Sequence, residues 1–145
     1  MHEEQVICCI QDNAEAYGFG ERIGRARVGG RGRGIDICFE DAAGLRHAFE
    51  AKGSHHSWGR CQKYFDDGFA RLPQMAFGLK ELRIGGIWQA ISPHKVSLVV
   101  PANGHFERHA ESFIPAFVVL GYGLYYAHPD HLELRVEPRL IGRAD

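Results

Sequence analysis

The spacing of apolar residues constrains the fold most, because it changes from helical to extended within the first third of the chain. Residues 3–16 carry apolar side chains at helical spacing, and the stop signal Gly18 follows. Residues 35–40 and 45–52 have the pattern of β-strands, and the four residues 41–44 between them fit a tight turn. The sequence therefore predicts an N-terminal helix followed by an antiparallel hairpin.

The remainder of the chain alternates between predicted helices and strands. The expected elements are a helix over 58–71, a strand over 95–100, a helix over 105–120, and a closing hairpin of strands over 123–127 and 132–137. Ser57 is placed to cap the first of these helices and Pro73 to stop it, while Pro115 must break or kink the second. This order predicts a single α/β domain over residues 1–145 with a mixed sheet.

Composition supports one ordinary globular domain. The 145 residues are 45% hydrophobic and 24% charged, which excludes a disordered tail and a coiled-coil rod. No C-x-x-C pair occurs among the four cysteines, so we expect reduced, buried thiols. The longest apolar run, residues 113–127, is shorter than the roughly 20 residues of a membrane span, and the first residues are acidic. We therefore expect a cytoplasmic protein without a membrane segment.

Local charge is uneven although the net charge is only −1. Residues 21–33 contain five arginines and one acid, interspersed with glycines. Guanidinium groups on a glycine-rich backbone suit contact with phosphates. We expect nucleic-acid contacts from Arg25, Arg27, Arg31 and Arg33. A solvated charged segment that binds nothing is the alternative.

The hairpin carries the strongest chemical signal. Asp36 interrupts the first apolar strand, and Glu50 and Lys52, two positions apart on the second, point to the same face. The turn brings the two strands together, so two carboxylates and a lysine converge. Carboxylates at that separation repel unless a cation neutralises them, and Mg²⁺ or Mn²⁺ is the usual partner of oxygen ligands. The alternative is a surface ion pair of Glu50 with Lys52.

The segment Gly34-Ile35-Asp36-Ile37, followed after the turn by Glu50-Ala51-Lys52, resembles the signature of the PD-(D/E)XK nuclease superfamily. In that superfamily the acid and the E-x-K lie on adjacent strands after an N-terminal helix, and a further helix follows. Ile35 stands where the signature has proline. The resemblance covers about residues 1–70, and it implies a restriction-endonuclease-like mixed sheet flanked by helices.

The resemblance also implies roles for individual residues. Asp36 and Glu50 would hold the divalent metal, the Ala51 carbonyl would add an oxygen ligand, and Lys52 would position or polarise the attacking water. A metal at this place lowers the pKa of a bound water and neutralises the charge that develops on phosphorus.

Further site residues are implied less directly. Glu4 on the first helix is a candidate metal ligand through water, Glu3 is an equal candidate, and both also suit a helix N-terminus. Gln62 is the candidate polar residue that orients the site from the following helix, although Asp66 stands where a Q-x-x-x-Y pattern needs tyrosine. His56 follows the E-x-K strand and is a candidate phosphate contact.

These features predict a Mg²⁺- or Mn²⁺-dependent nuclease that hydrolyses phosphodiester bonds in nucleic acid, with DNA as the expected substrate. One alternative is a non-catalytic nuclease-like module that binds DNA or protein. Another is a small-molecule enzyme that uses His105 and His109, four residues apart on a predicted helix. A homodimer is compatible with so small a nuclease, since cutting both strands of a duplex takes two active sites.

Overall fold

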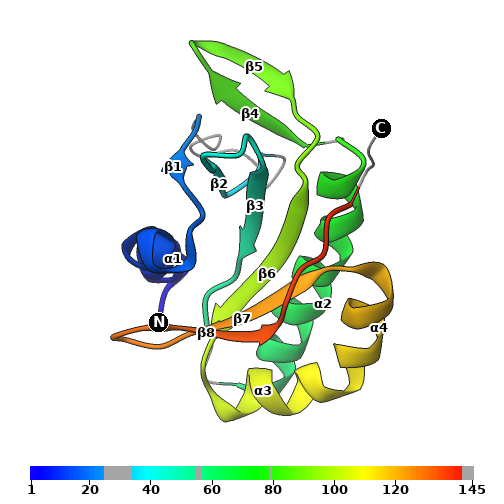
Figure 1. Ribbon diagram of the computed structural model, residues 1–145. Coiled ribbons are helices and arrows are strands. Elements are labelled where there is room, and N and C mark those ends of the chain that lie inside the picture. Colours follow the sequence, from blue (N-terminus) through cyan, green and yellow to red (C-terminus); the bar gives the residue numbers. More distant parts are fainter. Residues whose placement is uncertain (25–33, 55–56, 79, 142–145) are drawn as a thin grey trace.

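The computed structural model describes residues 1–24, 34–54, 57–78 and 80–141, and its centre is a six-stranded mixed sheet (Figure 1). In spatial order the strands are β1 (Glu21–Arg22), β2 (Ile37–Glu40), β3 (Arg46–Ala51), β6 (Lys95–Pro101), β7 (Gly123–Ala127) and β8 (Leu132–Val136). The central strands β3, β6 and β7 run parallel, and the outer pairs are antiparallel. The predicted α/β class with a mixed sheet is confirmed.

Helices cover both faces of the sheet (Figure 1). They are α1 (Glu3–Tyr17) on one face, and α2 (Trp58–Ala76), α3 (Gly104–Ala110) and α4 (Ile114–Leu120) on the other. Successive side chains of β3 point to opposite faces of the sheet, so the hydrophobic core has two parts. Phe49 packs toward α1, whereas Ala48 packs toward α2. None of the helices in the described ranges is long and apolar enough to cross a membrane.

A second hairpin, which the sequence pattern did not predict, projects from one end of the sheet (Figure 1). Its strands β4 (Glu81–Ile84) and β5 (Ile87–Ala90) form a separate two-stranded sheet. The hairpin is attached to the main sheet near its base, where the Ile35 N–H donates to the Glu81 carbonyl over 3.1 Å. This contact joins the segment that follows α2 to the segment that leads into β2.

Two predictions about prolines met different outcomes. Pro73 does not stop α2, which continues to Ala76. Pro73 removes only the one helical hydrogen bond that its own nitrogen would donate, and the fully buried Leu72 and Met75 on either side of it pack the last turn against the core. Pro115 does break the second predicted helix, where the 3₁₀ turn η1 (Glu111–Phe113) separates α3 from α4.

Phe65 of α2 packs the helices of one face together. The centroid of its ring lies 5.0 Å from that of Phe113 and 6.1 Å from that of Phe117. Its side chain is fully buried. We expect Phe65→Ala to lower the free energy of unfolding by about 3–5 kcal/mol, because the lost apolar burial leaves a cavity. Urea unfolding checks this value, and a loss below about 1 kcal/mol would contradict the described packing.

Candidate active site

The hairpin of β2 and β3 brings together the three side chains singled out in the sequence. Asp36 directly precedes β2, and its Oδ2 accepts a hydrogen bond of 2.8 Å from the Ala51 N–H. Lys52 follows β3, and its Nζ lies 3.5 Å from Glu50 Oε2. Both carboxylates and the lysine therefore belong to one cluster.

The strand register explains why they meet. Ile37 pairs with Phe49, so Asp36, one position earlier, comes level with Glu50 on the neighbouring strand. Glu50 alternates with Phe49, which packs toward α1, and so it faces the layer that contains α2.

Helix α2 closes over the cluster at Gly68. A Cβ atom at Gly68 would lie 3.2 Å from Lys52 Cγ and 2.6 Å from Leu98 Cδ1. The absence of a side chain therefore lets the helix approach the sheet while the aliphatic part of Lys52 passes beneath it. A pocket of about 240 Å³ opens beside this point, lined in part by Glu3, Lys52 and Tyr64.

Two further cations, which sequence analysis missed, join the cluster. Arg71 of α2 places its Nε 3.6 Å from Glu50 Oε2. Lys80 is only 4% exposed, and burial is the main reason why its pKa is lowered, followed by the charge of Arg71. The charges of Glu50 and Asp36 act on the pKa of Lys80 in the opposite direction.

Burial dominates the electrostatics of the two acids. Glu50 is 3% exposed, and burial, reinforced by the charge of Asp36, raises its pKa to about 8 against the opposing effect of Lys52 and Arg71. Burial also raises the pKa of Asp36, against the hydrogen bond from Ala51. Glu50 Oε1 is buried and finds no hydrogen-bond partner among the described residues. Such an oxygen is costly unless another group satisfies it.

Of the two acids at the start of α1, the structure brings Glu3 to the cluster. Burial raises the pKa of Glu3, and the charges of Asp36 and Lys52 act on it in opposite directions. The helix start lies against the segment after β3, since a Cβ at Gly53 would be 2.6 Å from the Glu3 nitrogen.

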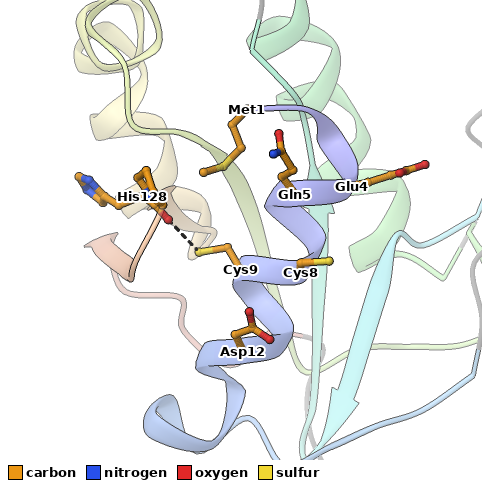
Figure 2. Close-up of a pocket in the computed structure, with 8 residues that line it drawn as sticks. Met1, Glu4, Gln5, Cys8, Cys9, Asp12 and His128 are labelled. Atoms are coloured by element: carbon orange, nitrogen blue, oxygen red, sulfur yellow. Dashed lines mark hydrogen bonds between the residues drawn. The ribbon is translucent and has the colours of Figure 1, made fainter.

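Glu3 and Glu4 are both exposed, but Glu4 lies away from the cluster. It lines a different pocket, of about 630 Å³, together with Cys9 and His128 (Figure 2). Successive side chains of a helix point about 100° apart, so only one of two adjacent acids can face the cluster. The candidate ligand role predicted for Glu4 therefore fits Glu3 better.

Gln62 also lies away from the cluster. It stands one turn before Asp66, whose Oδ1 bonds His109 Nε2 of α3 at 2.8 Å, so Gln62 belongs to the side of α2 that faces α3. Tyr64, Gly68 and Arg71 share the opposite side, at the spacing of successive helical turns. The structure does not bring Gln62 to the site for which it was a candidate.

The remaining candidates do not enlarge the cluster. Arg25, Arg27, Arg31, Arg33 and His56 lie outside the described residues. His105 packs against Trp58, with ring centroids 5.7 Å apart, and His109 is bonded to Asp66. Within the described ranges, no three histidine, cysteine or acidic side chains are grouped closely enough to hold a metal ion by themselves.

Comparisons with known proteins add evidence on the fold alone. No protein-family model matches the chain, and no curated protein matches it in sequence. Among solved structures, the chain is similar to the SPO1766 protein of unknown function from Silicibacter pomeroyi. The match has 12% sequence identity and a TM-score of 0.56, and it covers 99% of this chain and 76% of that one. The α/β architecture described above is thus shared with a bacterial protein whose function is not assigned.

Proposed function

We propose that this protein is a Mg²⁺- or Mn²⁺-dependent nuclease with a restriction-endonuclease-like fold, which hydrolyses phosphodiester bonds in DNA. The observation that carries the proposal is the group of Asp36, Glu50 and Lys52 at one end of a β-hairpin, in which Glu50 is buried and the other two are half-buried. A purely structural hairpin has no need of three ionisable side chains there, since burying each one carries a desolvation penalty.

The chemistry of the donors fits a divalent cation. Asp36 and Glu50 supply carboxylate oxygens, which hard cations such as Mg²⁺ prefer, and Glu50 Oε1 is a buried acceptor without a hydrogen bond in the described part of the chain. Two side-chain ligands suffice for Mg²⁺, which usually keeps several waters and takes oxygens from its substrate. The Ala51 carbonyl is the candidate for a further ligand. The metal would lower the pKa of a water and neutralise charge on the phosphate.

Lys52 is suited to act beside these carboxylates. Its aliphatic part is held under Gly68, and its Nζ is directed toward Glu50. In the proposed reaction the ammonium group donates hydrogen bonds to the attacking water or to a phosphate oxygen, and so it orients the nucleophile.

One observation favours the non-catalytic alternative. Lys52 and Arg71 both pair with Glu50, so the charges of the cluster are partly satisfied within the protein. A nuclease-like module that binds DNA or protein without cutting would retain such a network for structural reasons.

A plasmid-nicking assay distinguishes the two functions. The purified protein is incubated with supercoiled DNA in Mg²⁺, in Mn²⁺ or with EDTA, and Asp36→Asn is measured in parallel. We expect nicking only with added metal and a loss of nicking in Asp36→Asn. DNA binding without cleavage in any metal would instead support the non-catalytic module, and equal cutting by both proteins would place the activity elsewhere.

The arginine-rich segment is the proposed contact for the DNA backbone. Each neutralised phosphate releases counterions, so Arg31→Ala should reduce the slope of log affinity against log salt by roughly one unit. Filter binding at several salt concentrations, with metal omitted, measures the slope. Arg60→Ala, an exposed substitution on α2, is the control. Unchanged slopes for both Arg31→Ala and Arg27→Ala would remove this segment from the interface.

A further inference from the structure

We propose that Arg71 and Lys80, together with Lys52, form a phosphate-binding subsite within the candidate active site, and that Glu50 occupies it in the metal-free protein. This inference rests on the proposed function, because it assigns the group that binds the substrate phosphate. Arg71 and Lys80 lie outside the sequence motif that suggested a nuclease.

The position of Arg71 supports this role. It is presented on the same side of α2 as Gly68, where Lys52 passes beneath the helix, and its Nε lies 3.6 Å from Glu50 Oε2. Lys52 Nζ lies 3.5 Å from the same oxygen. Two cations from different elements thus converge on one oxyanion, which is the arrangement that a phosphate oxygen would use.

Lys80 is held at the same place by the backbone. Gly78, with φ of 71°, turns the chain after α2, and the next described residues lead into β4. The Ile35 N–H donates a hydrogen bond to the Glu81 carbonyl. Because Glu81 follows Lys80 and Ile35 precedes Asp36, this bond holds the backbone at Lys80 near the backbone at Asp36. Lys80 is 4% exposed, and the charges of Glu50 and Asp36 act on its pKa against the effect of burial.

The net charge of the cluster around Glu50 supports a phosphate-binding role for its cations. The groups that act on one another around Glu50 are two acids and three cations: Asp36, Glu50, Lys52, Arg71 and Lys80. With all five ionised they sum to +1, so a divalent ion held by the two acids would increase the excess of positive charge. Phosphate oxygens from the substrate would balance this charge.

Neutralising an acid should expose the subsite without any metal. We expect Glu50→Gln to bind inorganic phosphate in EDTA at pH 8.5, where Glu50 of the wild type is mainly ionised, measured by calorimetry and by the rise in melting temperature, with chloride at equal ionic strength as the reference. Adding Arg71→Gln should weaken phosphate binding about tenfold or more, which corresponds to a charge-assisted hydrogen bond of about 1.4 kcal/mol. Lys80→Met should weaken it similarly.

The matched control is Arg60→Gln in the same Glu50→Gln background, since Arg60 is exposed on the first turn of the same helix. Equal phosphate affinity with and without Arg71 would overturn the inference, and so would no phosphate binding by Glu50→Gln. If Glu50→Gln does not fold, Asp36→Asn removes a charge from the same cluster and gives the same comparison.

Nicking by the wild-type protein separates this inference from the proposed function. Phosphate binding that depends on Arg71, without nicking in any metal, supports the subsite and refutes the nuclease. Nicking together with phosphate binding that is independent of Arg71 supports the nuclease and refutes the subsite.

Discussion

Lys52→Ala should reduce the rate of DNA cleavage by about 10²–10⁴-fold, the range expected when a group that assists proton transfer is lost. The wild-type lysine reaches the cluster beneath Gly68 and ends 3.5 Å from Glu50. Arg71 stays beside Glu50 in the variant, so the acid keeps a cationic neighbour and the fold should survive. The loss should therefore appear mainly in the rate constant under saturating enzyme and metal, because the phosphate contact of Lys52 is only one of several contacts that hold the DNA.

Single-turnover cleavage of a labelled duplex measures that rate, and circular dichroism checks the fold. Lys63→Ala is the matched control, because Lys63 is an exposed lysine on α2 and should leave the rate unchanged. Cleavage by Lys52→Ala at the wild-type rate, with contaminating nuclease excluded by Asp36→Asn, would remove Lys52 from the proposed chemistry. A loss of DNA affinity as large as the loss of rate would assign Lys52 to binding alone.

The core of the candidate site could be predicted from sequence because it depends on local rules. A four-residue turn sets the register of the hairpin, and alternation along a strand puts Glu50 and Lys52 on one side. Asp36 then has to lie level with Glu50. Each of these steps uses neighbours in the chain, and the structure places the three side chains together as expected.

Arg71 and Lys80 could not be found in that way, because their place depends on tertiary packing. An arginine on an amphipathic helix has the same sequence pattern whether it meets solvent or a buried acid. Its proximity to Glu50 follows from how α2 crosses β3 at Gly68, and the position of Lys80 follows from the contact between Glu81 and Ile35. Both contacts join segments far apart in the sequence.

The choice between Glu3 and Glu4 also depends on tertiary packing, so the sequence pattern alone did not decide it. Both acids suit the first turn of α1, and their difference is only a rotation about the helix axis. The close approach of Gly53 to the start of α1 fixes that rotation, and it sets Glu3 against the cluster. A helix boundary predicted to within one residue would not have settled which acid lies beside the cluster.

Glu50→Gln should change how stability depends on pH in the metal-free protein. The pKa of Glu50 rises from 4.5 to about 8 on folding, chiefly through burial, so the folded protein keeps a proton that the unfolded chain has released. Between these values the unfolded state binds fewer protons, and the free energy of unfolding falls as the pH rises. The penalty is absent below about pH 4.5 and complete above about pH 8, with a size of roughly 3–5 kcal/mol.

Glutamine cannot titrate, so the variant should escape this penalty. We expect Glu50→Gln to gain stability relative to the wild type as the pH rises from 5 to 8.5, by up to roughly 3–5 kcal/mol. Urea unfolding in EDTA across this range measures the difference between the two proteins, in which the titration of other groups largely cancels. Glu15→Gln, an exposed substitution on α1, controls for a general effect of removing negative charge. A difference that stays constant with pH would show that Glu50 is ionised throughout, and that Lys52 and Arg71 offset its burial more completely than the geometry indicates.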